Sequence, residues 1–203
     1  MRHSWMVISL FLALPAGPLH AAESAKAAVA EDKAQALEQK VVNDAPPPKA
    51  PEKITPTEVQ AVDPAGQAPL DDSITCLART LYWEAKGADE TDMKAVASVV
   101  LNRLGKDGFP DTICGVVKQG VESKSCQFSW WCDGRPDQVE EKERYGVAKE
   151  IARKALNQQL QDSTAGALYF HDRTVRPDWA KAYRRTAQTT HFIFYKPNQA
   201  LAR

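Results

Sequence analysis

The stretch SITCLARTLYWEAKG at residues 73–87 decides the fold. Its apolar side chains at positions 74, 77, 81 and 85 recur at the spacing of one helix face. Asp72 or Ser73 is suited to cap the N-terminus of such a helix, and Gly87 ends it. We therefore expect a helix with one apolar face between Ser73 and Gly87.

Glu84 lies on the apolar face of this expected helix, at offsets of three and seven residues from two of its leucines. It belongs to the last turn, where the partial negative charge of a helix C-terminus disfavours a carboxylate. Burial beside Tyr82 and Trp83 disfavours the ionised form further, so we expect a raised pKa. A carboxylic acid that keeps its proton near neutral pH can protonate a leaving oxygen. The alternative is a solvated Glu84, or one paired with Lys86 or Arg79.

The rest of residues 71–203 predicts a mainly helical α+β domain. Apolar periodicity and turn signals predict helices over 89–105, 115–119 and 138–160, and β-prone runs over 167–171 and 191–195. The segment 120–136 has no sustained period. We expect a long central loop there, with a short strand at 127–130.

Two segments of different composition precede this domain. Residues 1–22 have a short basic start, an apolar run and small residues at Ala21 and Ala22, as in a secretory signal peptide. The apolar run is about half of the ~20 residues that span a bilayer, so we expect cleavage, and membrane attachment only if the signal stays uncleaved. Residues 23–70 contain no aromatic residue and are rich in Ala, Pro, Lys and Glu. They predict a disordered tether without a core helix, followed by one domain over 71–203.

Four cysteines in an exported domain predict two disulfides. Three pairings are open, and the sequence does not choose among them. One candidate joins Cys126 to Cys132 and Cys76 to Cys114. A zinc site is the rival interpretation, but the spacings are not paired CxxC units.

Five blocks of the sequence occur in a characteristic order. They are CLARTLYWEAKG at 76–87, AVASVVLNR at 95–103, FPDTICGVV at 109–117, CQFSWWCDG at 126–134, and closing β segments at 167–179 and 191–195. Together they resemble the SleB/CwlJ-type cell-wall hydrolase family, the spore-cortex-lytic enzymes and their relatives. The resemblance covers essentially all of residues 73–196.

The resemblance implies a lysozyme-like single domain, related to lytic transglycosylases, that cuts between N-acetylmuramic acid and N-acetylglucosamine. It also implies that Glu84 is the essential glutamate. The family often has an arginine, a glycine and a second acid after this glutamate, whereas Lys86 and Ala88 stand here in place of the arginine and the acid. A contact made by that acid would be missing, or made by Asp89 or Glu90.

A second catalytic carboxylate is not evident, and Asp133 is the best candidate by its position in the loop, although Asp133-Gly134 also suits a turn. Without a second acid, the 6-hydroxyl of the muramic acid could attack its own anomeric carbon. Other candidate substrate-binding residues are Gln127, Ser129, Trp130, His171 and Tyr195. For Trp130 and the histidines, the alternatives are core packing and structural hydrogen bonds.

Two other classes of protein remain open. A zinc amidase would need more than His171 and His191, and no HxxE or HExxH pattern occurs, so we expect neither a metal nor a cofactor. A non-catalytic peptidoglycan-binding module would use the same aromatic loop without needing an inward glutamate. Basic and acidic residues are balanced at 26 each, which gives no support for a nucleic-acid partner. We expect a monomer in the periplasm or cell envelope, with peptidoglycan glycan strands as its partner.

Overall fold

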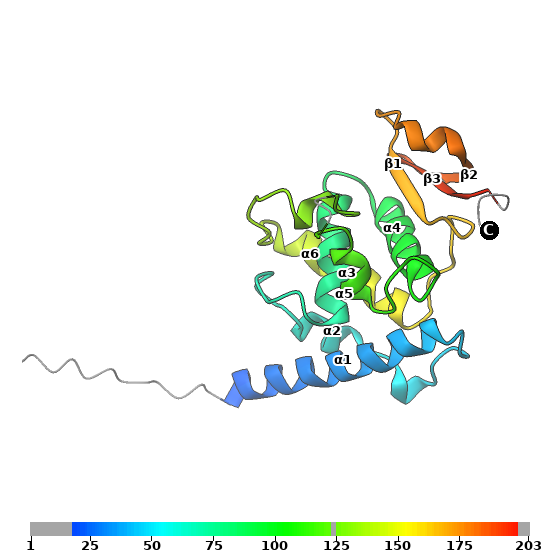
Figure 1. Cartoon of the computed structure of the whole chain (residues 1–203). Coiled ribbons are helices and arrows are strands. Elements are labelled where there is room, and N and C mark those ends of the chain that lie inside the picture. The colour runs from blue at the N-terminus through cyan, green and yellow to red at the C-terminus, as the bar shows by residue number, and fades with distance from the viewer. Residues whose placement is uncertain (1–17, 123–124, 199–203) are drawn as a thin grey trace, which may run out of the picture.

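The structure, a computed structural model, describes residues 18–122 and 125–198. Most of the expected signal segment, residues 1–17, lies outside them. The described residues form six α-helices and one small antiparallel sheet, which confirms the mainly helical α+β class (Figure 1). The elements are α1 (Pro18–Val42), η1 (Ala50–Glu52), α2 (Pro56–Ala61), α3 (Ser73–Glu84), α4 (Glu90–Arg103), α5 (Ile113–Lys118), η2 (Ser129–Trp131), α6 (Lys142–Leu156), β1 (Tyr169–Asp172), η3 (Asp178–Ala182), β2 (Tyr183–Gln188) and β3 (Phe192–Pro197). No helix in the described ranges has the length and apolar character needed to cross a bilayer.

Helix α3 lies at the centre of the helical part (Figure 1). Asp72 caps it as predicted, and its side chain accepts a hydrogen bond from the Thr75 N–H at 2.8 Å. Ten of the twelve residues of α3 are buried, and α1, α4, α5 and α6 all contact it. Gly87 adopts a φ of +84° just beyond its end, a conformation that favours glycine. The helix that carries Glu84 is therefore held on nearly all sides.

Helix α6 is shorter than the helix predicted over 138–160, because tertiary contacts hold both of its ends. At its N-terminus, the Tyr82 hydroxyl accepts a hydrogen bond from the Glu141 N–H at 3.2 Å. At its C-terminus, Asn157 accepts from the N–H of Ile54 and donates to its carbonyl, both at 2.9 Å. Sequence periodicity gives no information on these tertiary contacts, so it did not predict where α6 begins and ends.

The three strands have the spatial order β1-β3-β2, with Tyr169 opposite Tyr195. The two predicted β-prone runs correspond to β1 and β3, whereas β2 was not predicted, because YRRTAQ is mostly polar and exposed. The strand predicted at 127–130 is wrong, and η2 occupies the second half of that segment. An extended run from Cys126 to Cys132 would span about 20 Å, far beyond the reach of the disulfide that joins them.

The prediction of a disordered tether over 23–70 is also wrong. Helices α1 and α2 contact each other, and both contact α6 (Figure 1). Ala30, Ala34 and Leu37 form a helical stripe on α1 that is buried in the same hydrophobic core as α3. The stripe is narrow, but two alanines allow the helix backbone to approach closely, so little apolar surface is needed.

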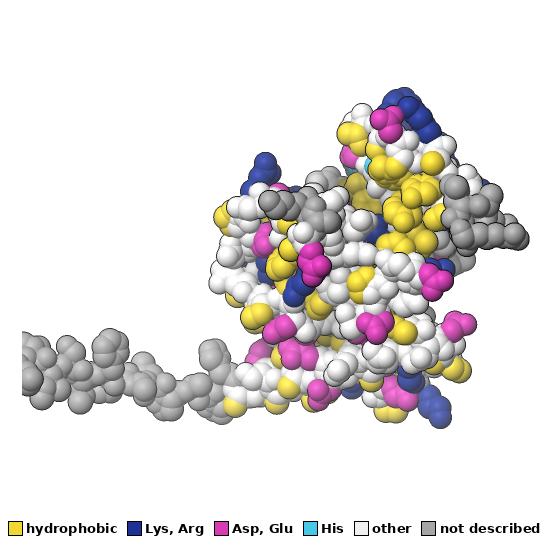
Figure 2. Space-filling view, viewed as in Figure 1, with side chains coloured by type: hydrophobic (Ala, Val, Ile, Leu, Met, Phe, Trp, Pro, Cys, Tyr) yellow, Lys and Arg dark blue, Asp and Glu magenta, His cyan; other side chains and the backbone are white. Residues whose placement is uncertain are grey.

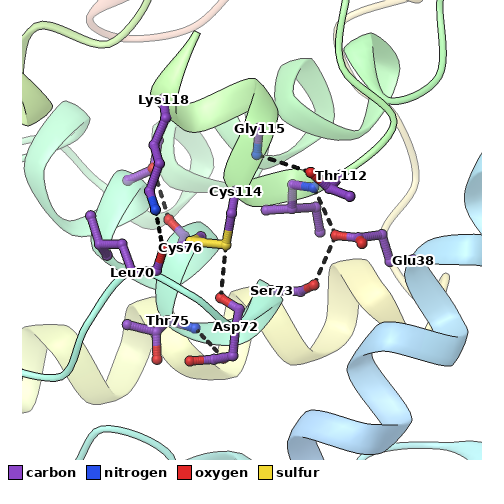
Figure 3. Close-up of a disulfide and its surroundings, with 12 residues drawn as sticks. Glu38, Leu70, Asp72, Ser73, Thr75, Cys76, Thr112, Cys114, Gly115 and Lys118 are labelled. Carbon is purple, nitrogen blue, oxygen red and sulfur yellow. Dashed lines mark hydrogen bonds between the residues drawn. A yellow bond between two sulfur atoms is a disulfide. The ribbon is translucent and has the colours of Figure 1, made fainter. Parts of the chain in front are cut away.

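Buried polar contacts add to this attachment. Glu38 of α1 accepts hydrogen bonds from the Ser73 hydroxyl at 2.8 Å and the Ile113 N–H at 2.7 Å, at the N-termini of α3 and α5 (Figure 3). Asp63 accepts a hydrogen bond from the Tyr145 hydroxyl at 2.8 Å and lies 3.5 Å from Arg79 of α3. Glu38 and Asp63 thus accept hydrogen bonds from buried donors of the domain. The average composition of residues 23–70 gives no sign of these contacts.

The cysteines form the candidate pairing named above. Cys76–Cys114 joins α3 to α5, and Cys126–Cys132 closes the loop around η2 (Figure 3 shows the first). No free cysteine occurs in the described part of the chain. The two bonds fix the partner helix of α3 and the loop that approaches its C-terminal end.

We predict that Leu37→Ala lowers the free energy of unfolding by about 2–4 kcal/mol, because it leaves a cavity under α1. Urea denaturation of the oxidised whole chain measures this loss. The matched control is Val29→Ala, which truncates a side chain on the same helix that is 45% exposed and should change stability by less than about 0.5 kcal/mol. Equal effects of the two substitutions would mean that α1 does not pack on the domain in solution.

Candidate active site

The end of α3 brings Glu84 to the junction of two clefts. The first, here called the Trp83 cleft, has a volume of about 550 Å³ and lies between the end of α3, η2 and residues 133–140. The second, here called the sheet cleft, has a volume of about 650 Å³ and lies between α4, the disulfide loop and β1 with η3. Glu84 and Ser129 line both clefts. A long substrate could therefore pass Glu84 with segments bound on either side.

The Trp83 cleft combines an aromatic wall with a charged rim. The indole Nε1 of Trp83 donates to the Asp137 carbonyl at 3.2 Å, which fixes the ring. Lys86 lies 4.4 Å from the centre of the same ring and forms an ion pair with Glu140 at 2.6 Å. Asp133 also lines this cleft, and its carboxylate accepts from the Arg135 N–H at 2.8 Å.

The sheet cleft carries a group of mutually packed aromatic rings. Tyr169 of β1 stacks on Tyr183 of β2, with ring centres 4.8 Å apart. Trp179 of η3 lies against both, at 5.9 and 5.7 Å, and remains 37% exposed. An exposed indole held by two other rings offers a flat apolar face of the kind that packs on a pyranose ring.

The pKa of Glu84 is raised, as its position in the sequence predicted. Burial raises its pKa to about 7, and the positive charge of Arg103 opposes part of that rise. Among the described residues, no group donates a hydrogen bond to its carboxyl. The group is thus poised to be protonated near neutrality and to lose that proton at modest cost.

Arg103, which sequence reasoning missed, is the cation that acts on Glu84. It lies at the end of α4, is only 3% exposed, and lines the sheet cleft. Its Nε donates to the Leu168 carbonyl at 2.8 Å, and its guanidinium lies 5.1 Å from the Phe128 ring and 5.7 Å from the Tyr169 ring. Burial lowers its pKa to about 10, which keeps it charged at neutral pH. The signal for it was an arginine at the end of a helix that has Val96 and Val100 on its apolar face.

The two clefts contain most of the predicted substrate-binding residues. Gln127, Ser129 and His171 line the sheet cleft, and Ser129, Trp130 and Asp133 line the Trp83 cleft. Tyr195 lines neither. Trp130 is largely packed into the core at 6% exposure. Residues that line the clefts but were not predicted include Trp83, Arg103, Asp137, Asp172, Trp179 and Tyr183.

The two histidines considered for zinc occupy separate places. His171 Nε2 lies 3.0 Å from the Tyr195 hydroxyl, and His191 Nδ1 lies 2.7 Å from an Asp92 oxygen at the start of α4. Within residues 18–122 and 125–198, no three His, Cys, Asp or Glu side chains are arranged to hold a metal ion. Both histidines make the structural hydrogen bonds that were weighed as their alternative role.

Comparison with known proteins assigns the family. Residues 87–195 match the Cell Wall Hydrolase family model, so this chain belongs to that family. The match begins at Gly87, three residues after Glu84. Similar curated proteins include spore cortex-lytic enzymes. A spore cortex-lytic enzyme of Halalkalibacterium halodurans is 34% identical over 119 residues, which are 57% of this chain and 32% of that protein. The chain thus spans about a third of the length of that curated relative.

Two solved structures are also similar. The catalytic domain of the Bacillus cereus SleB protein has a TM-score of 0.50 and 26% identity, over 61% of this chain and 89% of that one. The catalytic domain of a germination-specific lytic transglycosylase, SleB, from Bacillus anthracis has a TM-score of 0.49 and 28% identity, over 61% and 93%.

We predict that Arg103→Gln raises the pKa of Glu84 further, because it removes the positive charge that favours the carboxylate. Carbon-13 NMR titration of labelled Glu side chains measures the shift. Arg103→Lys keeps the charge and should leave the pKa near its starting value, as should Arg135→Gln, which removes an exposed cation of the Trp83 cleft. An unchanged pKa in the Gln variant would exclude Arg103 as the controlling charge.

Proposed function

We propose that this chain cleaves the glycan strands of peptidoglycan between N-acetylmuramic acid and N-acetylglucosamine, as a lytic transglycosylase with Glu84 as general acid and base. The observation that carries the proposal is a carboxyl group with a pKa of about 7 at the junction of two clefts. Membership of the Cell Wall Hydrolase family supports the substrate class.

In the first half of the reaction, protonated Glu84 donates its proton to the glycosidic oxygen as the bond to the muramic acid breaks. The resulting carboxylate is stabilised by the fixed charge of Arg103. It then accepts a proton from the 6-hydroxyl of the same muramic acid, whose oxygen attacks the anomeric carbon. The products are a 1,6-anhydro end and a new N-acetylglucosamine end, and Glu84 regains its proton.

Binding across both clefts would use different chemistry on each side of Glu84. In the sheet cleft, Trp179 offers an indole face to a sugar ring, and Gln127 offers an amide to an N-acetyl group. In the Trp83 cleft, Asp133 and Asp137 offer hydrogen-bond acceptors to sugar hydroxyls. Hydrolysis through Asp133 as a second carboxylate is the competing outcome, and product analysis distinguishes it.

The proposed substrate lies outside the cytoplasm. Two disulfides in a cell-wall hydrolase agree with an extracytoplasmic location. We propose export through cleavage of the signal segment, and the periplasm or cell envelope as the working compartment, where a monomer acts on glycan strands.

Mass spectrometry of peptidoglycan digested by the whole chain tests the reaction. We expect products with 1,6-anhydromuramic ends, and a loss of at least about a thousandfold in Glu84→Gln, which keeps the shape of the side chain but cannot donate the proton. Glu143→Gln, on the exposed surface of α6 and outside both clefts, is the control and should retain activity. Reducing muramic ends would replace transglycosylation by hydrolysis, with Asp133→Asn tested next. Intact glycan with freed peptides would contradict glycan cleavage altogether.

The pH dependence follows from the raised pKa of Glu84. The first step needs the protonated acid, so the rate should be level below about pH 6 and fall about tenfold per pH unit well above pH 7. Initial rates of soluble-fragment release, measured at constant ionic strength, test this. A rate that keeps rising between pH 7 and pH 9 would mean that Glu84 does not act as the acid.

A further inference from the structure

A third hollow, here called the tip hollow, adjoins the sheet cleft. It has a volume of about 270 Å³ and lies between β3 and the turn that leads from β1 into η3. His171 lines both the sheet cleft and the tip hollow, and Tyr195 lines only the latter. The hydrogen bond between His171 and Tyr195 therefore forms part of the partition between the two spaces.

The lining of the tip hollow has one sign of charge. Arg173, Arg176 and Lys181 are exposed on its rim, and no Asp or Glu lines it. Val175 and Ile193 add apolar side chains to the lining, and Val175 is 51% exposed. Figure 2 shows basic side chains gathered at this end of the molecule, next to a large hydrophobic surface.

The three cations differ in how many of their hydrogen-bond donors are engaged by other residues of the chain. Lys181 forms an ion pair with Asp178 at 2.8 Å, which lies outside the hollow. Arg173 donates one Nη1 hydrogen bond to the Thr190 carbonyl at 2.8 Å, which orients its guanidinium and leaves further donors free. Arg176 makes no ion pair within the described residues. A guanidinium of this kind binds carboxylates with two parallel hydrogen bonds.

We propose that the tip hollow binds the peptide stem of the substrate through its carboxylates, while the glycan lies in the sheet cleft. The inference rests on the proposed function, because a stem reaches the hollow only when its muramic acid occupies the adjoining cleft. The stem is attached to the glycan through a lactyl group and carries small apolar side chains and free carboxylates. The apolar side chains of the stem match Val175 and Ile193, and its carboxylates match the cations on the rim.

Binding measured in the Glu84→Gln background tests the proposal independently of cleavage. Isothermal titration calorimetry of the whole chain would use three preparations of uncrosslinked glycan strands. The first has intact stems, the second has its carboxylates blocked as methylamides, and the third has stems removed by an amidase, which leaves the lactyl carboxylate.

We expect Arg176→Gln to weaken binding of intact strands by about two- to fivefold, the upper part of the range for one exposed ion pair, and Arg173→Gln to do the same. Neither variant should alter binding of blocked or stem-free strands. The matched control is Arg184→Gln, which removes an exposed arginine of β2 that does not line the hollow and should change nothing. Equal weakening on stem-free strands would assign the contact to the lactyl group and overturn the proposal, as would an unchanged affinity for intact strands.

The same variants in the catalytically intact chain separate the two hypotheses. With intact strands, Arg176→Gln should raise KM with little change in kcat, because the contact lies outside the reacting atoms. If the chain binds strands in a stem-dependent way but cuts no glycan, the proposed function is refuted and stem binding in the tip hollow is retained. If the chain cuts glycan with the same KM whether or not the stem is present, stem binding in the tip hollow is refuted and the proposed function is retained.

Discussion

Burial of α3 on nearly all sides is the constraint on which the rest of the structure depends. Helix α3 is surrounded by α1, α4, α5 and α6, and a charged residue buried there needs a partner of opposite charge. Arg79 of α3 is such a residue, since it is only 3% exposed. Asp63 provides the opposite charge, and Tyr145 donates a hydrogen bond to the same carboxylate. The only part of α3 that reaches open space is its C-terminal end, which is where Glu84 meets the two clefts.

The chemistry at that end depends on a balance of two opposing effects. Burial alone would hold Glu84 in its neutral form, and a fully solvated carboxyl would be ionised throughout the neutral range. Arg103 moderates the first effect, and it is fixed by the Leu168 carbonyl and by the aromatic rings around it. Because the guanidinium is already held in place, little rearrangement is needed when the carboxyl changes charge.

Local signals predicted what depends on local structure. The cap at Asp72, the end of α3 before Gly87 and the inward position of Glu84 could all be predicted from spacing, as could the order of the helices α3 to α6. Contacts between distant segments could not. The attachment of α1 depends on Ala30, Ala34 and Leu37 meeting a surface built by later helices, and the average composition of residues 23–70 conceals it. Arg103 and Trp179 were missed for the same reason, since each matters only beside residues far away in the sequence.

The bond between Ile54 and Asn157 spans 103 residues. The contacts between the N-terminal segment and α6 therefore cannot form until α6 has been synthesised. Closing so long a loop costs chain entropy before any contact compensates for it, so long-range pairings of this kind tend to come late in folding. Helices α1 and α2 are made early, yet they acquire their full native surroundings only after α6. Until then, the faces of α1 and α2 that contact α6 are exposed to solvent.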